Sequence, residues 1–421
     1  MSKSLPKGWK IEKIGNLCEV GRGSSPRPIV DSKYFEGGTI PWIKIADATK
    51  SGKYLYETKE KVNKYGASFS RLLPKGSLIV AASGTLGYTQ ILGVDGCIHD
   101  GWLYLSNFQR VNKDFLYYLL QWRKDYFYNS AYGAAIQNVN TIILREMEIM
   151  LPPLHTQLKI ASILSAYDDL IENNTRRIQI LEEMAQAIYK EWFVNFRFPE
   201  HEKVKMIESE LGLIPQGWEV KRLKELVEPQ YGYTESATEE QIGPKFLRGT
   251  DVNKSTYINW DSVPFCKIDQ EDFEKYRLKI GDIVIIRMAD PGKIGIVEAE
   301  VNAIFASYLI RLKIKSDSIR PYYLFHFLSS EKYQNYIKGA STGTTRKSAS
   351  AGVVTDIDLC IPPLRLIIEF ENNVYVLRKQ LNLLLEKNNN LRHTRDLLLP
   401  KLISGEIDVE GLDIDINGVM T

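Results

Sequence analysis

Two long stretches of the chain carry apolar residues at alternating steps of four and three, which predicts two long helices. The first pattern runs from Ile160 to Trp192, and the second runs from Phe370 to Leu402, 210 residues later. A seam sustained over more than four heptads favours a coiled coil over a simple amphipathic surface helix. The seam positions are Ile160, Leu164, Tyr167, Ile171, Asn174, Ile178, Leu181 and Trp192 in the first helix, and Phe370, Val374, Leu381, Leu384, Asn388, Leu391, Leu398 and Leu402 in the second.

A Pro-Pro pair precedes each of these helices. The chain reads LPPL at 151–154 and IPPL at 361–364. Proline lacks a backbone N–H, and its ring clashes with the preceding turn, so each pair lies just outside the helix that follows it. Each helix is expected to be about 50 Å long at a rise of about 1.5 Å per residue.

A single Asn in each seam indicates how the two helices pair. A lone buried amide is costly unless it meets a partner, so Asn174 is expected to face Asn388. This contact requires an antiparallel pairing in which the two residue numbers sum to 562, which also pairs Ile160 with Leu402 and Trp192 with Phe370. A parallel pairing would place each Asn opposite an apolar residue.

The segments before the two helices also repeat. LPKGWKIEKIGNL at 5–17 recurs as IPQGWEVKRLKEL at 214–226, and the apolar runs at 72–91 and 276–297 share a Gly-containing turn. Apolar runs of strand length, such as SLIVAAS and DIVIIRM, come before helical patterns such as KDFLYYLLQW and PYYLFHFLSS. The predicted fold class is α+β, with two mixed α/β domains held apart by a two-helix antiparallel coiled coil.

The repeat divides the chain into a first domain, a helix, a second domain, a second helix and a tail, with an approximate two-fold axis. The predicted ranges are 1–150 for the first domain, 151–198 for the first helix, 199–360 for the second domain with a short linker at its start, 361–409 for the second helix and 410–421 for the tail.

Composition and charge are those of a soluble globular protein. The sequence is 44% hydrophobic and 25% charged, and no apolar run approaches the length of a membrane span, so we expect a cytoplasmic protein. The four cysteines have no C-x-x-C spacing, which argues against a disulfide framework or a structural zinc site. Residues 1–155 hold 20 Lys and Arg against 13 Asp and Glu, a basic balance compatible with a polyanionic partner.

The motifs of common catalytic sites are missing from the sequence. There is no phosphate-binding P-loop, no G-x-G-x-x-G after a strand, no Asn/Asp-Pro-Pro-aromatic tetrapeptide, no G-x-S-x-G and no H-E-x-x-H. The sequence DPGK at 290–293 is interpreted as a turn. Cys97 and His99 are too few for a metal site, so we expect neither a catalytic residue nor a metal in this chain.

Two diverged domains, each followed by a PPL-headed helix, and the ending TRDLLLPKLISGEI at 394–407 resemble the specificity (HsdS) subunits of type I restriction-modification systems. The resemblance covers nearly the whole chain, and the two helices carry it most specifically. It implies that the domains are target recognition domains, each reading one half of a bipartite, non-palindromic site on double-stranded DNA. The helices would set the spacing and dock the partner subunits.

The same resemblance implies the partners and cofactors. The partners would be two methyltransferase (HsdM) subunits and restriction (HsdR) subunits, with S-adenosylmethionine, ATP and Mg²⁺ bound on those partners and no cofactor in this chain. We expect the outer faces of both helices to contribute to docking, for example Arg176, Arg177, Glu182, Glu183, Arg392 and Asp396. The apolar residues Phe193, Phe196 and Phe198 are expected to cap the coiled coil against the domains.

Candidate DNA contacts are basic or hydroxyl residues in Gly-rich turns and near strand ends, where they can reach phosphates and guanine edges. The candidates are Arg22, Arg27, Lys44, Lys50, Lys53 and Ser83 in the first domain, and Arg248, Lys254, Arg287, Lys293, Thr344, Thr345, Arg346 and Lys347 in the second. For any one of these residues, a solvated surface position is the simpler interpretation.

Two other functions remain open on the sequence. One is a coiled-coil scaffold protein that does not bind DNA, and the other is a stand-alone DNA-modifying enzyme with unrecognised motifs. Failure to bind DNA even with partner subunits would favour the scaffold, and activity of the isolated chain would favour the enzyme.

Overall fold

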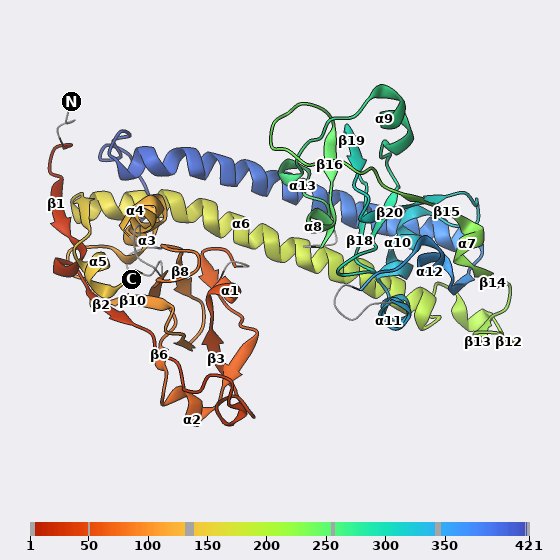
Figure 1. Ribbon diagram of the computed structural model, residues 1–421, viewed down its shortest axis with the longest axis horizontal. Coiled ribbons are helices and arrows are strands. Elements are labelled where there is room, and N and C mark those ends of the chain that lie inside the picture. Colours follow the sequence, from red (N-terminus) through yellow and green to blue (C-terminus); the bar gives the residue numbers. More distant parts are fainter. Residues whose placement is uncertain are drawn as a thin grey trace. The chain divides into compact units, whose positions relative to one another are not determined.

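A computed structural model of the chain describes residues 5–48, 51–130, 139–253, 257–341, 347–416 and 418. The chain divides into two compact units. Unit 1 holds residues 1–176 and 384–421, and unit 2 holds residues 177–383. Each unit therefore combines one globular domain with part of each long helix (Figure 1).

The globular part of unit 1 is built on two sheets. The larger has the strand order β2-β10-β7-β8-β4, and the smaller has the order β5-β3-β9-β6. Their strands are β2 Glu19–Arg22, β10 Trp102–Ser106, β7 Leu78–Ala81, β8 Thr89–Leu92, β4 Tyr54–Leu55, β5 Glu60–Val62, β3 Ile40–Ile43, β9 Gly96–Ile98 and β6 Arg71–Leu73. Strand β7 is buried at every position, because both of its faces are covered by apolar side chains.

Short helices and one further strand pair complete unit 1. Strand β1 (Lys10–Lys13) pairs antiparallel with β11 (Glu148–Leu151), which leads into the first Pro-Pro pair. The helices are α1 Ile45–Ala48, α2 Lys64–Ala67, α3 Lys113–Trp122, α4 Lys124–Ser130 and α5 Thr141–Arg145. Helix α3 is the predicted KDFLYYLLQW segment, and Asn112 caps it by accepting from Phe115 N at 2.9 Å.

Unit 2 repeats this topology. Its four-stranded sheet has the order β15-β20-β17-β18, and β16 pairs parallel with β19 as β3 does with β9. The strands are β15 Val227–Tyr231, β20 Leu309–Ile314, β17 Ile283–Ile286, β18 Ile294–Ile296, β16 Lys245–Leu247 and β19 Ala303–Phe305. Strand β14 (Glu219–Arg222) pairs with β21 (Asp358–Ile361) ahead of the second Pro-Pro pair.

The remaining elements of unit 2 are short helices and a hairpin. The helices are α7 Leu223–Leu226, α8 Gly249–Val252, α9 Gln270–Tyr276, α10 Pro321–Ser329, α11 Glu331–Ala340 and α12 Ala351–Thr355. Helix α10 is the predicted PYYLFHFLSS segment without its last residue. The hairpin of β12 (Met206–Ser209) and β13 (Gly212–Pro215) lies in the linker that follows the first long helix.

The long helices are α6 (Leu154–Tyr189) and α13 (Leu364–Ile403), and each begins directly after its Pro-Pro pair. A π-helical turn, Lys190–Val194, continues α6, so residues 195–198 lie beyond the helix that was predicted to include them. All of the predicted seam residues are buried or half-buried. None of the helices in the described ranges is long and apolar enough to cross a membrane.

Within unit 1 the helices run antiparallel. Asn174 Nδ2 donates to Asn388 Oδ1 at 2.9 Å, the pairing that the sequence predicts. Asn388 Nδ2 also lies 3.3 Å from Ile171 O and from Thr175 Oγ1, so the buried amide is well satisfied. Ile160 and Leu402, a second predicted pair, lie in the same apolar core.

Within unit 2 the other halves of the helices also run antiparallel. The rings of Trp192 and Phe370 lie 6.2 Å apart, as the same pairing rule predicts. Phe193 packs edge-on to Phe370 at 5.0 Å, and Phe196 and Phe198 contact Trp218 of the domain. These phenylalanines thus cover the end of the helix pair in unit 2.

A buried polar network attaches the domain of unit 1 to the long helices. Lys53 pairs with Asp114 at 2.7 Å and donates to Ser165 of α6 at 2.8 Å. Tyr118 of α3 donates to Asp168 of α6 at 2.6 Å, and Asp168 pairs in turn with Arg395 of α13. These bonds between polar groups in a low-dielectric interior fix the domain on the helices.

Unit 2 has an equivalent attachment built from different residues. Arg378 of α13 forms two bonds to Glu298, from Nε at 2.8 Å and from Nη2 at 2.6 Å. Tyr322 of α10 donates to the same carboxylate at 3.0 Å. The guanidinium is 2% exposed, so this bidentate pair is internal to the unit.

Candidate nucleic-acid interface

The ends of four strands meet at one edge of the domain in unit 1. Ala82, after β7, donates its N–H to Gly101 O at 2.8 Å, and His99, after β9, donates to Ile43 O at 3.2 Å. Gly23, after β2, donates to Trp102 O at 2.8 Å. Segments that are remote in the sequence are thereby held in one loop cluster.

This cluster brings together four of the predicted DNA-contact residues, which are Arg22, Arg27, Lys44 and Ser83. Arg22 Nε donates to Asp100 O at 2.8 Å, and Arg27 forms an ion pair with the Asp100 carboxylate. Ser83 is half-buried, and a Cβ built on Gly101 would lie 2.8 Å from its Oγ, so the two loops touch. The first domain therefore presents several cations around one acidic residue.

His99 and Asp100 are members of this cluster that were not among the predicted DNA-contact residues. His99 Nε2 lies 3.1 Å from Asp100 Oδ1. Burial lowers the pKa of His99, and the nearby cations Lys44, Arg27 and Arg22 add to that effect, which together outweigh the opposite influence of Asp100. The ring is therefore neutral near pH 7. Its position directly after β9 was the available signal, because strand ends meet at sheet edges.

Unit 2 builds the same loop cluster with equivalent backbone bonds. Arg287 donates its N–H to Tyr308 O at 3.0 Å, and Ala306 donates to Leu247 O at 2.9 Å. Ala349 donates to Arg287 O at 2.8 Å, matching the bond from Val139 to Ala82 O at the same distance in unit 1. The two units thus share a scaffold while their side chains differ.

Three predicted DNA-contact residues lie in this second cluster, which are Arg248, Arg287 and Lys347. The Arg287 guanidinium lies over the Tyr231 ring at 4.8 Å, a cation–π contact. Lys347 is exposed and accepts at its carbonyl from Ala289 N at 3.0 Å. Lys293 is exposed in the turn between β17 and β18, where the sequence DPGK forms the turn expected of it.

The two loop clusters share a short sequence pattern, a basic residue followed three positions later by Asp. KIADATK at 44–50 and RGTDVNK at 248–254 share a basic residue followed three positions later by Asp, at an offset of 204. Asp47 accepts from Lys44 N at 3.0 Å, and Asp251 accepts from Arg248 N at 2.9 Å. In each case the carboxylate lies in the one-turn helix that follows the strand, α1 or α8, and accepts from the backbone N–H of the residue just before that helix.

Lys53 is a correction to the predicted DNA-contact set. Its side chain is 1% exposed and its charge is satisfied by Asp114 inside the unit, so it cannot reach a ligand on the surface. Burial alone would lower the pKa of Lys53, but the Asp114 carboxylate and its other neighbours outweigh that effect and raise the pKa above its usual value. Lys50, Lys254, Thr344, Thr345 and Arg346 lie outside the described residues.

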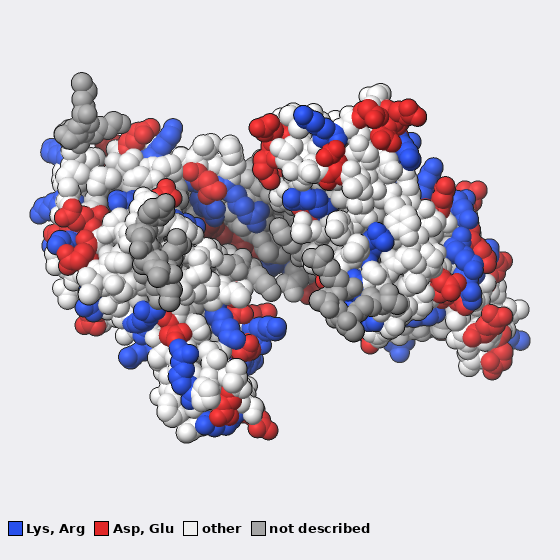
Figure 2. All heavy atoms as spheres, viewed as in Figure 1, with Lys and Arg blue, Asp and Glu red and all other residues white. Residues whose placement is uncertain are grey.

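Charge on the visible face of unit 1 is mixed. Lys and Arg side chains gather beside α1, with acidic side chains among them (Figure 2). Lys44 illustrates this arrangement, because its ammonium pairs with Glu60 at 2.5 Å and lies over the Trp42 ring at 4.7 Å. A polyanion would have to displace such acids from their cations in order to bind.

Five of the six predicted docking residues on the long helices are exposed. Arg176, Arg177, Glu183, Arg392 and Asp396 are exposed, although Arg176 pairs with Glu172 at 2.5 Å. The prediction was wrong for Glu182, because its side chain is 20% exposed and approaches Arg378 at 4.0 Å instead of facing outward. The sequence missed several apolar residues that the helices expose, which are Leu170, Ile180, Met184, Ile368, Tyr375, Val376, Leu383 and Leu397.

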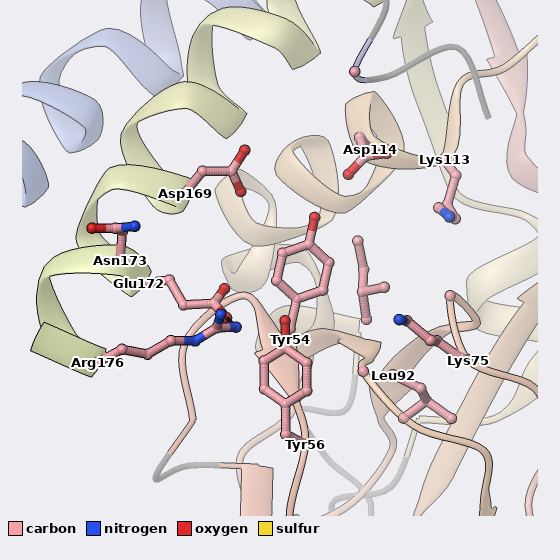
Figure 3. Close-up of a pocket in the computed structure, with 14 residues that line it drawn as sticks. Tyr54, Tyr56, Lys75, Leu92, Lys113, Asp114, Asp169, Glu172, Asn173 and Arg176 are labelled. Carbon is pink, nitrogen blue, oxygen red and sulfur yellow. Dashed lines mark hydrogen bonds and ion pairs between the residues drawn. The ribbon is translucent and has the colours of Figure 1, made fainter. Parts of the chain in front are cut away.

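A polar cavity of about 450 Å³ lies between the domain and α6 in unit 1. Lys75 and Lys113 line one side, Asp169, Glu172 and Arg176 line the other, and Tyr54 and Tyr56 project between them (Figure 3). The lining carries three acids and three bases, which gives no preference for a ligand of one charge. Among the described residues, no group of three His, Cys, Asp or Glu side chains could hold a metal ion.

The chain matches one protein family twice. The match is to the "Type I restriction modification DNA specificity domain" over residues 6–183 and 215–370. The first matched stretch covers the first globular domain and most of α6, and the second covers the second domain and the start of α13, so the family description applies to both copies of the repeat.

Two relatives from Methanocaldococcus jannaschii are similar over almost their full length. The chain is 27% identical to the type I restriction enzyme MjaIX specificity subunit, covering 97% of this chain and 95% of that one. It is 25% identical to the MjaVIII specificity subunit, again covering 97% and 95%. The fold resembles that of a type I restriction-modification S subunit from M. genitalium, with a TM-score of 0.57 at 16% identity over 95% of this chain and 98% of that chain.

Proposed function

The chain belongs to the family of type I restriction-modification DNA specificity subunits, and on that premise we propose that it reads a bipartite DNA site for a complex of this kind. Specificity subunits are the non-catalytic members of these enzymes. The finer proposal concerns which part of this chain reads DNA, what form the target takes and which surfaces bind the partner subunits.

The observation that carries the proposal is the repeated loop cluster. Equivalent backbone hydrogen bonds hold Ala82 and Arg287 at the same place in their units, and different side chains surround them. A shared scaffold with different side chains is what two readers of two different half-sites require, because base identity is read by side chains while the scaffold positions them. The target is therefore bipartite and non-palindromic.

The candidate contacts divide by chemistry. Arg22, Arg27, Lys44, Lys293 and Lys347 are at least partly exposed cations, suited to phosphates and, in the case of arginine, to guanine. Binding would exchange the internal acids Asp100 and Glu60 for phosphate oxygens. Lys50, Lys254, Thr344, Thr345 and Arg346 remain DNA-contact candidates from the sequence.

The docking proposal rests on the long helices. Their exposed apolar residues, such as Ile180 and Met184 on α6 and Tyr375 and Leu383 on α13, are about half exposed, which is unusual for large apolar side chains in a row on a helix. The exposed charged residues Arg176, Arg177, Glu183, Arg392 and Asp396 lie on the same two helices. We propose that methyltransferase subunits, two in number because the helices repeat, bind here and that restriction subunits join the same complex.

The test is to co-express the chain with its methyltransferase subunit and to map modified bases across the host genome. S-adenosylmethionine is expected on the methyltransferase subunit, and ATP and Mg²⁺ on the restriction subunit. A motif of two short defined elements separated by a fixed undefined gap is the expected result. A complex that forms and modifies one continuous DNA element would contradict the proposal of a bipartite target. A complex that never binds DNA would favour a scaffold function.

A further inference from the structure

We propose that Arg248 of unit 2 reads a guanine through a guanidinium that Asp251 holds in place. This inference rests on the proposed function, since it names the base that the loop cluster of unit 2 recognises. The proposal arises from the way in which the shared basic-x-x-Asp segment is used differently in the two units.

Asp251 binds the side chain of Arg248 as well as its backbone. Arg248 Nε lies 3.0 Å from Asp251 Oδ2, and Arg248 Nη2 lies 2.9 Å from Asp251 Oδ1, which makes a bidentate pair. The Asp251 side chain is 4% exposed and also accepts from Arg248 N at 2.9 Å, so the carboxylate itself is fixed by the start of α8. The guanidinium plane is consequently oriented by a rigid support.

One edge of the Arg248 guanidinium takes no part in the bidentate pair. The pair uses Nε and one side of Nη2, while Nη1 and the second N–H of Nη2 point along the other edge of the fork. The Arg248 side chain remains 36% exposed. Two parallel N–H groups on a planar fork match O6 and N7 of guanine in the major groove, the commonest specific contact of arginine with a base.

Prior orientation strengthens such a contact. An arginine side chain loses considerable rotamer entropy when it is fixed, and here Asp251 has already fixed it before DNA binds. The carboxylate also disfavours a simple phosphate contact on that side, because it repels phosphate oxygens. Arg248 is therefore better suited to a base edge than to the backbone.

The equivalent position in unit 1 lacks these features. Lys44 has a single ammonium and cannot make a bidentate contact. Asp47 accepts from Lys44 N and from Lys59 N, at 3.0 and 3.1 Å, and the Lys44 ammonium pairs with Glu60 instead. Lys44 therefore serves as a matched control that shares the position and the charge but not the fork.

Other arginines of unit 2 are less suited to reading a base. The side chains of Arg311 and Arg378 are 11% and 2% exposed and are committed to Asp282 and Glu298. Arg287 is half-buried with its guanidinium over the Tyr231 ring, and no carboxylate of the described residues lies within hydrogen-bonding distance of it. Among the described arginines of this loop cluster, Arg248 thus combines a fixed orientation with an open edge.

The experiment uses the complex of the full chain with its methyltransferase subunit and a duplex library randomised in both half-sites. The wild-type complex should select a guanine at one position of the half-site read by unit 2. Arg248→Lys keeps the charge and the Asp251 cap on the backbone but loses the fork, so preference for that guanine should fall by roughly 5- to 150-fold. The other half-site should be unchanged.

Two controls separate this outcome from its alternatives. Lys44→Ala should weaken binding to all sequences alike and lower the salt dependence by about one phosphate contact, without a change of motif. In the wild-type complex, replacing the selected guanine by 7-deazaguanine, which lacks the N7 acceptor, should cost affinity that Arg248→Lys no longer shows. The wild-type half of this second measurement does not depend on how well the variant folds.

The inference is wrong if Arg248→Lys leaves the motif intact, whether affinity falls uniformly or does not fall, or if 7-deazaguanine costs both complexes equally. These results would leave the proposed function standing, because the wild-type complex would still select a bipartite site. Absence of any selected motif in the wild-type complex would instead contradict the proposed function.

Discussion

Asn174 and Asn388 form the only pair of seam amides among the described residues, with Nδ2 of Asn174 donating to Oδ1 of Asn388 at 2.9 Å. The two side chains are 9% and 1% exposed. A buried amide pair contributes little net stability but penalises any register that separates its members. The contact therefore specifies how α6 and α13 align in unit 1.

Replacing one member of this pair should be worse than replacing both. Asn388→Leu would leave the Asn174 amide buried without its partner and should lower the free energy of unfolding by about 1–3 kcal/mol. Asn174→Leu combined with Asn388→Leu should recover most of that loss. Urea unfolding of the four proteins of the cycle measures the coupling, with Leu at the exposed Asn390 as control. Additive single effects would show that the amides do not interact.

The Lys53–Asp114 pair predicts a stability effect where the sequence suggested a DNA contact. Lys53→Met should destabilise the chain by about 3–5 kcal/mol, because it leaves a buried carboxylate unpaired. Lys53→Met with Asp114→Leu should recover much of this loss. Thermal unfolding provides the measurement, and the exposed Lys75→Met is the control. A stable Lys53→Met protein with weakened DNA binding would show that Lys53 contacts DNA after all.

His326 predicts a loss of stability in acid. Complete burial, assisted by Arg378, lowers its pKa to about 3, so the ring is neutral in the folded chain. The unfolded state takes up a proton below its ordinary pKa near 6.5, and the stabilisation present above that pH is lost as pH falls toward 3. Between pH 7 and pH 5 the cost should be about 2 kcal/mol.

His326→Phe tests this linkage, because the ring packs among Tyr189, Phe325 and Phe370. The difference in unfolding free energy between the variant and the wild type should shift in favour of the variant as pH falls from 7 to 5. The exposed His393→Gln variant should follow the wild type. A difference that is independent of pH would show that His326 does not carry the effect.

The exposed apolar residues of α6 predict which substitutions should weaken binding of the methyltransferase subunit. Ile180 is 54% exposed on α6, and Ile180→Glu should leave the chain folded while weakening association with the methyltransferase subunit by roughly 5- to 30-fold. The neighbouring exposed Gln179→Glu adds the same charge without removing an apolar side chain. Titration of the partner by light scattering or calorimetry distinguishes the two. Equal effects of both variants would assign the change to charge.

The long helices were the most predictable part of the molecule. Their seam spacing, the Pro-Pro pairs and the lone Asn of each seam act locally or through one pairwise rule, so Asn174 and Asn388 could be matched from their residue numbers alone. The residue at which α6 ends was less predictable. The π-helical turn at 190–194 ends α6 early because the aromatic cluster around Phe193 and Trp218 fixes that segment by tertiary packing.

The loop clusters were only partly predictable. Arg22, Lys44 and Ser83 were chosen as basic or hydroxyl residues in Gly-rich turns and near strand ends, and the fold brings them together because the ends of β2, β3 and β7 meet. Lys53 was chosen on the same grounds but is buried, since its partner Asp114 lies 61 residues away in the sequence and no local pattern announces the pair. The bidentate support of Arg248 by Asp251 depends on side-chain geometry, which spacing alone does not give.

The central claim is that one chain reads two separate half-sites. The most direct test measures how DNA affinity depends on the length of the gap between them. The complex is titrated with duplexes in which the undefined gap keeps its length but changes sequence, and with duplexes in which it is lengthened by one base pair. If one chain reads both half-sites, the gap has a required length, so affinity should be unchanged for the first set and much lower for the second. Equal affinity for both sets would contradict the account, because it would mean that a single element supplies the recognition.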